Sequence, residues 1–339
     1  MRLFSLTKEI AIDLGTANTV IIHNDKIVID EPSIVALDRR TDKLIAVGKE
    51  AQQMQGKENE MIRTVRPLRK GVIADFNAAE LMIRGLVKKA SSKSNWFSPS
   101  LRMVVGIPSG STEVEIRAVR DSSEHAGGRD VYMIYEPMAA ALGIGLDVTA
   151  PEGNMIVDIG GGTTEIAVIS LGGIVSNKSI QVAGDDLTDD IMNHMKRAHN
   201  VRVGERTAEA IKMNVGSALT ELDNPPADYI VHGPNQMTAL PMEVPVSYQE
   251  ISHCIEKSIS KIETAVLGAL EQTPPELYAD IVHNGIYLAG GGALLRGLDK
   301  RLTNKIGIQF HVAEDPLLSV AKGTGVALKN VEKFSFLIR

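Results

Sequence analysis

Residues 155–180 read MIVDIGGGTTEIAVISLGGIVSNKSI, a pattern of three short apolar runs separated by two glycine-containing turns. The first run ends at Asp158, and the glycines at 160–162 follow at once. Short β-branched runs bounded by glycine are typical of strands. Glycine lets the backbone approach a bound group closely, and successive amide N–H groups around a tight bend bind anions. The segment therefore predicts an antiparallel meander whose first turn is a phosphate-binding loop.

The same arrangement opens the chain. An apolar run ends in Asp13, a turn follows at 15–18, and two further runs occupy 19–23 and 26–29. Asp13 and Asp158 are separated by close to half of the 339 residues. An internal duplication explains a pattern that recurs at this distance. We therefore expect two related lobes whose phosphate-binding loops face each other.

Strands and helices alternate beyond the two meanders. Apolar runs at 104–107 and 131–134 flank a helical pattern at 111–125, which predicts parallel strands joined by a crossover helix. Isoleucines at helical spacing predict another helix over 247–270. The predicted fold class is α/β, with a mixed sheet flanked by helices in each lobe.

Each lobe also carries an insertion. A hairpin pattern at 33–38 and 43–47, followed by a polar, charged segment, marks the first insertion, and two helical patterns mark the second. We predict a first lobe at 1–145 with its subdomain at about 30–71, a second lobe at 146–317 with its subdomain at about 184–245, and a C-terminal helix at 318–339 that returns to the first lobe.

The composition argues against several classes of protein. A formal net charge of −6 argues against a protein that wraps nucleic acid, which needs a broad basic surface. The single cysteine cannot form an internal disulfide, and no apolar run approaches the ~20 residues of a membrane span, so we expect a cytoplasmic protein. Aromatic residues make up only 4% of the chain, so the core has to be built from aliphatic side chains and methionine.

Asp13 and Asp158 each end a strand beside a phosphate-binding loop. A carboxylate in this position is a natural ligand of Mg²⁺, which keeps most of its own water molecules. One Asp-x-Gly turn would be an ordinary hairpin about as often as a site. Two of them at duplicated positions predict a clamp for a polyphosphate.

Glu136 stands where the run at 131–134 ends and an alanine-rich helix begins, with Pro137 suited to the first helical position. The ends of parallel strands are where α/β folds place their sites. Glu136 could orient or deprotonate a water molecule aimed at a γ-phosphate, assisted by the Thr163 hydroxyl. It could equally be a carboxylate that interacts with the helix dipole, and the residues alone leave both alternatives open.

Two further groups have a structural and a functional interpretation. A third glycine run, 290–292, follows a strand pattern at 286–289 and precedes a helical pattern at 294–306; it is either a simple turn or a loop that lies against a nucleotide. Glu209 and Lys212, three residues apart on a helix, form either an ion pair or hydrogen bonds to a ribose and base.

These motifs resemble the actin, heat-shock chaperone and sugar kinase superfamily. Within it, the chain resembles the MreB family of bacterial actin homologues over nearly its whole length, through AIDLGTANT (11–19), YEPMAAALGIGL (135–146), VDIGGGTTEIAV (157–168), GERTAEAIKMNVGSA (204–218) and LAGGGALLRGLD (288–299). The resemblance implies an actin-like ATPase that polymerises into membrane-bound double filaments, maintains rod shape and organises cell-wall synthesis.

The resemblance also implies roles for individual residues. It places Gly15, Thr16, Ala17 and Asn18, with Gly160, Gly161, Gly162 and Thr163, at the phosphates of ATP; Asp13 and Asp158 near Mg²⁺, through water; Glu136 with Thr163 at the attacking water; and Glu209, Lys212, Gly290, Gly291, Gly292 and Ala293 at the adenosine. The implied partners are further copies of the chain, a lipid surface at the inner face of the cell membrane and membrane proteins of wall elongation, but no nucleic acid.

Two positions depart from the family pattern. Many relatives carry an acidic residue where Tyr135 stands and an aspartate where Lys70 stands. We expect neither to touch the catalytic set, and both to affect local surface charge and filament contacts.

Trp96 and Phe97 adjoin each other in a polar, serine-rich loop that follows Lys88 and Lys89. An aromatic pair outside any periodic pattern, flanked by lysines, fits insertion at the interface of an anionic bilayer. The alternative is that both rings fold back onto the protein. Relatives carry a hydrophobic membrane-binding loop at this place, which favours the lipid.

Two other functions of the same superfamily fit less well. A sugar kinase needs an aspartate base and a polar acceptor pocket, and no candidate for either stands beside the phosphate-binding loops. A chaperone needs a substrate domain, for which we expect no room before Arg339. The sequence therefore favours water as the acceptor of the phosphoryl group.

Overall fold

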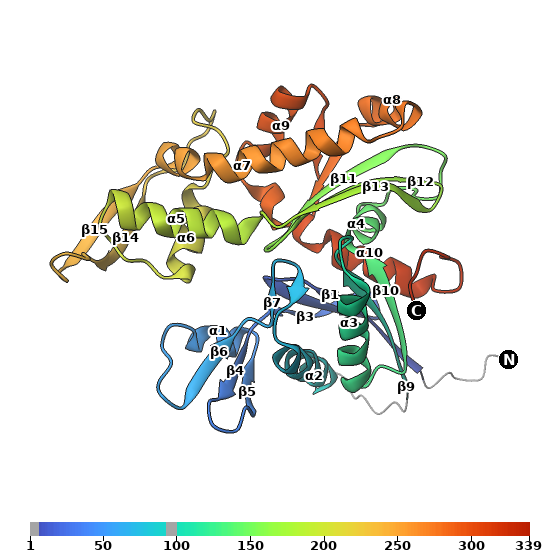
Figure 1. The fold of residues 1–339 in the computed structure, drawn as a ribbon, viewed down its shortest axis with the longest axis horizontal. Helices are drawn as coiled ribbons and strands as arrows, with labels where there is room; N and C mark the ends of the chain where they lie inside the picture. The colour runs from blue at the N-terminus through green and yellow to red at the C-terminus, as the bar shows by residue number, and fades with distance from the viewer. Residues whose placement is uncertain (1–6, 93–99) are drawn as a thin grey trace.

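The computed structural model describes residues 7–92 and 100–339. It has two lobes, each built on a five-stranded mixed sheet (Figure 1). The first sheet contains β1 (Thr7–Leu14), β2 (Asn18–His23), β3 (Lys26–Pro32), β9 (Ser100–Ile107) and β10 (Asp130–Tyr135). The second contains β11 (Asn154–Ile159), β12 (Thr164–Ser170), β13 (Gly173–Ile180), β16 (Ile286–Ala289) and β17 (Phe310–Val312).

The two sheets have the same topology. Their strand orders are β10-β9-β1-β2-β3 and β17-β16-β11-β12-β13, the second written here in reverse. In each, a three-stranded antiparallel meander continues into two parallel strands on the other side of its first strand. The duplication, both meanders and the parallel pair of β9 and β10 are therefore confirmed, and so is the α/β fold class.

Helices cover the sheets and join the lobes. The first half contains α2 (Phe76–Ser92), α3 (Glu113–His125) and α4 (Glu136–Ile144); the second contains α7 (Tyr248–Glu271), α8 (Pro275–Asn284), α9 (Leu298–Ile306) and α10 (Ser319–Lys329). Helices α4 and α10 pack on each other at the junction of the lobes (Figure 1). Because α4 packs against strands of both sheets, the limits of the lobes at 145 and 146 stay a prediction.

The end of the chain lies against the first lobe. Helix α10 packs on β1, β2 and β9 as well as on α4. Beyond it, Ile338 and Met133 of β10 exchange two backbone hydrogen bonds of 2.8 and 2.9 Å. The last residues are therefore not helical but extend the edge of the first sheet.

Each insertion contains more structure than its pattern predicted. The first has the expected hairpin of β4 (Val35–Asp38) and β5 (Leu44–Val47), but its polar segment also forms α1 (Lys49–Met54), β6 (Ile62–Val65), β7 (Leu68–Arg69) and β8 (Val72–Ile73). The second has the two expected helices, α5 (Gly184–Ala198) and α6 (Glu205–Val215), and a hairpin of β14 (Tyr229–Pro234) and β15 (Pro241–Val246).

The expected helix at 294–306 is wrong at its start. The glycine run leads into a 3-10 turn, η1 (Gly291–Leu294), and α9 begins only at Leu298. Gly297 precedes it with φ of 72°, a left-handed conformation that interrupts a right-handed helix. A second 3-10 turn, η2 (Pro316–Leu318), precedes α10.

The core is aliphatic, as the composition predicted. One cluster fills each lobe, and a third, centred on α4 and α10, joins the two sheets. Within the described residues, the buried aromatic side chains are Phe310, Tyr132 and Tyr248. The same region contains no helix with the length and apolar character needed to cross a bilayer.

Candidate functional site

The two predicted phosphate-binding loops meet between the lobes. A Cβ atom added to Gly161 would lie 2.8 Å from the Cβ of Ala17, and one added to Gly162 would lie 2.8 Å from Thr16 Oγ1 and 2.7 Å from Lys70 Cα. These separations are too short for any side chain, so only glycine permits the contact. The structure thus brings together the loops at 15–18 and 160–163.

Neighbouring elements hold the carbonyl groups of both loops. In the first lobe, Ser33 Oγ donates to Gly15 O at 2.6 Å and Ser33 N to Ala17 O at 2.9 Å. In the second, the amides of Gly184 and Asp185, at the start of α5, donate to Gly160 O and Gly161 O at 3.1 and 2.7 Å. Each loop is therefore fixed by the insertion of its own lobe.

Four carboxyl groups gather at these loops. Asp13 and Asp158 occupy matching registers, opposite Val20 in β2 and opposite Glu165 in β12. Burial raises the pKa of Asp13 to about 7. Burial, and then the charges of Asp13 and Glu165, raise the pKa of Asp158 to about 7. Asp13 keeps part of its surface accessible, whereas Asp158 is only 5% exposed.

Glu136 belongs to the same group. It lies in the first turn of α4, and burial raises its pKa well above the ordinary value, followed by the charges of Glu165, Asp13 and Asp158. Glu136 therefore lies among the carboxyl groups at the loops, and its role at an attacking water stays a prediction.

The carboxyl group of Asp158 suits a divalent cation. Among the described residues, Asp158 Oδ1 is buried and has no hydrogen-bond partner. A buried oxygen of this kind is costly unless it is paired, and Mg²⁺ is a hard cation that prefers carboxylate oxygens. The residues present thus fit the metal that the sequence predicted.

The third glycine run lies directly against Asp158. A Cβ added to Gly290 would lie 2.4 Å from Asp158 Oδ1, and one added to Gly292 would lie 2.2 Å from Ile159 Cγ2. Gly290 N donates to Pro316 O at 2.9 Å, and the buried Ala293 donates its amide to Gly290 O at 3.2 Å. The run at 290–293 is therefore part of the same site.

Comparison with known proteins shows the family of this chain. The family model described as MreB/Mbl protein matches residues 7–336. The chain belongs to the MreB/Mbl family. It is 44% identical over 337 residues to the cell shape-determining protein MreB of Escherichia coli strain K12, with 96% of this chain and 94% of the relative covered. It is 42% identical over 327 residues to the cell shape-determining protein Mbl of Bacillus subtilis strain 168, covering 96% and 97%.

Solved structures agree with the family. The crystal structure of MreB5 of Spiroplasma citri bound to AMPPNP is 37% identical and superposes with a TM-score of 0.90, covering 97% of this chain and 98% of that one. The MamK double helical filament, 20% identical with a TM-score of 0.79, shows the same fold over 96% and 99%. This MreB/Mbl chain therefore has the actin-like fold of a cytoskeletal protein.

Glu209 and Lys212 of this MreB/Mbl chain form the ion pair, at 2.7 Å. Lys212 Nζ also donates to Gly184 O at 2.9 Å and to Thr188 Oγ1 at 3.0 Å, and Thr188 Oγ1 bonds to Glu209 at 2.7 Å. Since Gly184 in turn bonds to the second phosphate-binding loop, the pair connects α6 to that loop. The structural interpretation holds here, and contact with an adenosine stays a prediction.

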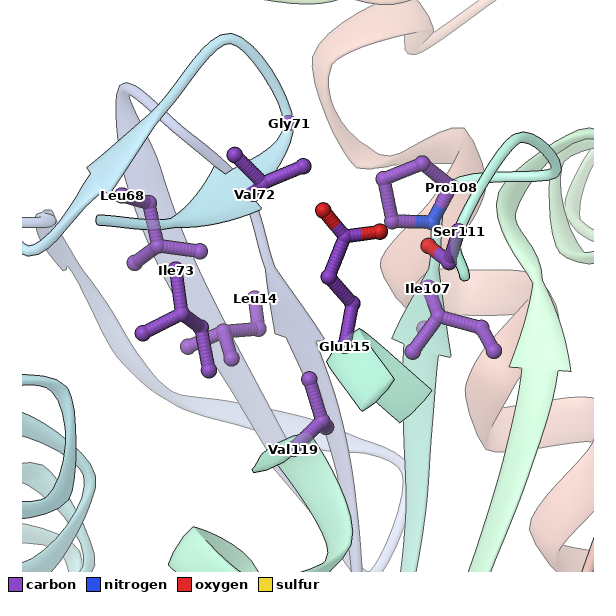
Figure 2. A pocket seen from close by; sticks show the side chains of 11 residues that line it. Leu14, Leu68, Gly71, Val72, Ile73, Ile107, Pro108, Ser111, Glu115 and Val119 are labelled. Carbon is purple, nitrogen blue, oxygen red and sulfur yellow. The ribbon is translucent and has the colours of Figure 1, made fainter. Parts of the chain in front are cut away.

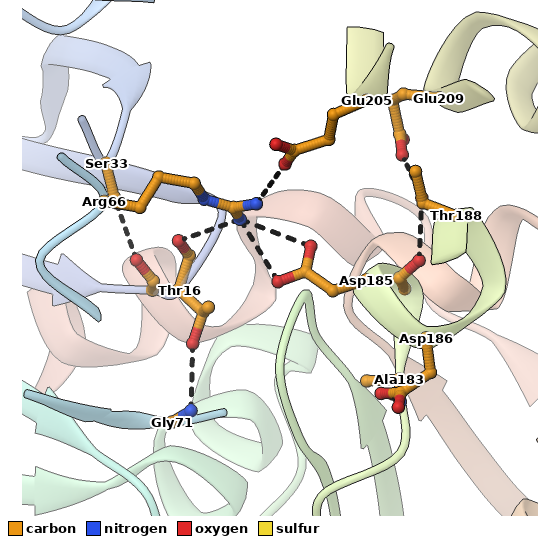
Figure 3. A network of polar contacts seen from close by, with 12 residues as sticks. Thr16, Ser33, Arg66, Gly71, Ala183, Asp185, Asp186, Thr188, Glu205 and Glu209 are labelled. Carbon is orange, nitrogen blue, oxygen red and sulfur yellow. Dashed lines mark hydrogen bonds and ion pairs between the residues drawn. The ribbon is translucent and has the colours of Figure 1, made fainter. Parts of the chain in front are cut away.

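Arg66 joins the insertions of the two lobes across the mouth of the site (Figure 3). Its guanidinium donates to both oxygens of Asp185 at 3.2 Å, to Glu205 and, at 3.4 Å, to Thr16 O. Glu205 also accepts from Gln55 at 3.0 Å. Sequence reasoning missed this network because its members lie in different halves of the chain.

Glu165 was missed as well, although it follows Thr163 and Thr164 directly. It is 1% exposed, and its carboxylate accepts from Ser109 N at 3.1 Å and from Ser179 Oγ at 2.5 Å. Glu165 lies opposite Asp158 in the sheet, which would have indicated a place at the site. That position follows from the register of β11 and β12, which the sequence alone does not give.

Lys70 was expected not to touch the catalytic set, but its backbone lies against the loop that precedes Thr163. The contact with Gly162 places Lys70 Cα at the second phosphate-binding loop, while its Nζ lies 3.9 Å from Asp186. Tyr135 precedes Glu136 as the N-cap residue of α4. Both departures therefore adjoin the site.

A small, mostly apolar pocket lies in the first lobe, next to the predicted phosphate-binding loops. Its lining includes Leu14, Gly71, Pro108 and Glu115 (Figure 2). The Glu115 carboxylate accepts from Thr112 N at 2.7 Å, as half of the capping box that begins α3. The carboxylate in the pocket is therefore already used by the fold.

Trp96 and Phe97 lie outside the described residues. Of the lysines before them, Lys88 is exposed, but Lys89 forms an ion pair with the nearly buried Glu31 at 2.8 Å. Lys89 is thus turned toward the protein, and the contribution expected from it at a lipid surface is reduced.

Proposed function

We propose that this chain binds ATP with Mg²⁺ between its lobes and hydrolyses it while assembling into filaments on the inner face of the cell membrane, where they maintain rod shape and organise wall synthesis. The observation that supports the proposal most is the contact of two predicted phosphate-binding loops from different lobes beside four carboxyl groups. The AMPPNP and ADP complexes of the relative MreB5 support the choice of an adenine nucleotide.

The loops at 15–18 and 160–163 would hold the phosphates. Their carbonyls are bonded to other elements, which fixes the bends whose amides bind anions. Loops from two lobes can bind the same polyphosphate only when the lobes are closed. Binding and closure are therefore one event in this proposal.

Asp13 and Asp158 would hold Mg²⁺ through its water molecules. When bound, the ion neutralises charge on the phosphates and on these carboxylates. The unpartnered Asp158 Oδ1 would gain the partner that the fold does not supply.

Glu136 and Thr163 would act on water. The raised pKa of Glu136 makes its carboxylate a better proton acceptor than an ordinary glutamate. Glu136 would orient the attacking water and accept its proton, and the Thr163 hydroxyl would hold the same water from the opposite loop.

Glu209, Lys212 and the run at 290–293 would contact the adenosine. Lys212 is only 15% exposed within its network, whereas Glu209 is 45% exposed. Glu209 is therefore the member that can turn to a ribose without breaking the bond from Lys212 to Gly184.

The proposed partners are further copies of the chain in double filaments, the lipid surface through Trp96 and Phe97, and membrane proteins of wall elongation. They come from the family resemblance and from the character of the loop at 93–99.

Purified protein with MgATP on an anionic lipid monolayer tests the proposal, by electron microscopy and by phosphate release. We expect paired filaments on the lipid and slow release of phosphate. Transfer of the phosphoryl group to a small-molecule acceptor, with no filaments at any protein concentration, would instead support a kinase of this fold.

A further inference from the structure

A second group of metal-binding side chains lies away from the nucleotide cleft. His194 of α5, His199 and Glu250 of α7 each offer one ligand atom, and these three atoms lie within 4.8 Å of one another. Both imidazoles direct Nε2 at the same carboxylate oxygen, Glu250 Oε1, and the distance from His194 is 2.5 Å. Three atoms of types that bind metal ions are therefore gathered in one place.

Two helices fix these side chains. The five-residue spacing of the histidines would place them on different faces of a continuous helix. Helix α5 ends at Ala198, however, and His199 is its C-cap residue, so its ring turns back toward His194, with 5.8 Å between ring centroids. Glu250 lies in the first turn of α7, where Ser247 caps the helix and accepts from Glu250 N at 3.2 Å. Helices α5 and α7 pack on each other (Figure 1).

An ion can reach this point. The side chains of His194, His199 and Glu250 are 26%, 25% and 24% exposed. They are thus ordered by their neighbours but open on one side, which leaves a coordination position for water. A zinc ion about 2.0–2.1 Å from its ligands sets neighbouring ligand atoms about 3.3 Å apart, so a small rotation of the carboxylate would admit it.

The donor set selects the kind of ion. Two imidazoles and one carboxylate suit zinc and similar divalent transition metals, whereas Mg²⁺ and Ca²⁺ prefer oxygen alone. The thiol of Cys254, one turn further along α7, is not among the converging atoms. We propose that His194, His199 and Glu250 bind a divalent transition metal ion of the zinc type, with water completing the coordination.

Bound there, the ion would fix the end of α5 to the start of α7. The other end of α5 begins at Gly184, whose amide bonds to the second phosphate-binding loop. The site is thus separate from the nucleotide cleft but shares a helix with it.

Titration of untagged, chelator-treated protein with Co²⁺ tests the proposal. One equivalent should give the strong visible absorption of four-coordinate cobalt, and one equivalent of Zn²⁺ should remove it. The nucleotide cleft offers oxygen ligands, so cobalt bound there would absorb only weakly. Absence of the strong absorption in the wild-type protein would overturn the proposal, whatever any variant does.

Two variants locate the ion. His194→Gln should weaken Co²⁺ binding at least about tenfold, since even residues that only support a ligand contribute that much. His232→Gln is the matched control, because His232 also pairs with a single carboxylate, Glu243, at 3.3 Å but lies in the hairpin of β14 and β15. Zn²⁺ should raise the Tm of the wild-type and His232→Gln proteins and not that of His194→Gln. Equal Co²⁺ affinity in all three proteins would place the ion elsewhere and refute this site.

Discussion

At the scale of single residues, the site is an unbalanced set of charges. Asp13, Glu136, Asp158 and Glu165 lie together. Burial raises the pKa of Asp13, and burial followed by the charges of neighbouring carboxylates raises the pKa values of Glu136 and Asp158. The Glu165 carboxylate accepts hydrogen bonds from Ser109 N and Ser179 Oγ. The divalent cation of the proposed function would offset these buried negative charges.

Glu136→Gln should slow ATP hydrolysis by about 10²-fold or more, because the amide keeps the shape of the side chain but cannot accept the proton. Nucleotide affinity should change little, since the amide can still hydrogen-bond to water. Phosphate release and binding of a fluorescent ATP analogue measure the two effects. The exposed Glu152→Gln serves as control. An unchanged hydrolysis rate in Glu136→Gln would remove Glu136 from the mechanism.

Asp158 should make the nucleotide-free protein less stable as the pH rises. Its pKa is about 7 in the folded chain against 3.8 ordinarily, so the folded chain binds more protons between these values. Stability from this group is therefore complete below about pH 4 and is lost as the pH rises to about 7. Asp158→Asn should raise the free energy of unfolding at pH 8 by about 1–3 kcal/mol, because it removes a buried unpaired charge.

Unfolding by urea at pH 5 and pH 8, without nucleotide, checks this dependence. The gain in Asp158→Asn should be larger at pH 8 than at pH 5, and the exposed Asp228→Asn should show no such difference. A gain of the same size at both pH values would mean that the charge of Asp158 is not the cause.

At the scale of elements, the sequence pattern predicted those strands and helices whose formation depends on their own residues. The meanders, the strand at 286–289 and the helix at 247–270 were all predicted, since each shows its own period or glycine turn. The helix expected from Leu294 failed because Gly297 adopts a positive φ that apolar spacing does not reveal. The roles of Glu165 and Arg66 were not predicted, because their hydrogen-bond partners lie in distant segments of the chain.

The crossing of α4 and α10 depends on glycine. A Cβ on Gly323 would lie 1.6 Å from Ala139 O, and one on Gly143 would lie 1.8 Å from Ser319 O, so the two backbones touch. Gly323→Ala should lower the free energy of unfolding by about 1–3 kcal/mol or more, as overpacking does. Because this pair also joins the sheets, nucleotide binding should weaken with it.

Gly325→Ala is the matched control for that change. It lies in the same helix, but its added Cβ would meet Ile22 at an ordinary 3.7 Å. Removing a glycine from a helix interior should then stabilise the protein by about 0.5–1 kcal/mol. Chemical denaturation compares the two variants, and equal effects from both would contradict the role given to the crossing.

At the scale of the whole molecule, two duplicated lobes close on one cleft and share two connections. Helices α4 and α10 form the permanent connection at the back, and the Arg66 network with Asp185 and Glu205 spans the mouth. Ion pairs that are a fifth to two-fifths exposed are weak and easily exchanged. In the proposed function, opening for nucleotide exchange would break the Arg66 network and leave the packing of α4 and α10 intact.

The proposed membrane contact also depends on the whole assembly. Burying two aromatic side chains contributes at most about 3 to 6 kcal/mol, which gives a single chain only weak, reversible binding. A filament that presents many such loops gains avidity.

Replacing Trp96 and Phe97 with serine should therefore abolish co-sedimentation of filaments with anionic liposomes and leave ATP binding unchanged. Leu171→Ser, which removes a side chain that is 71% exposed in a turn of the second lobe, should leave co-sedimentation intact. If the double variant still pellets with liposomes as the wild type does, the loop at 93–99 is not the anchor, and the basic and apolar residues at 1–6 become the next segment to test.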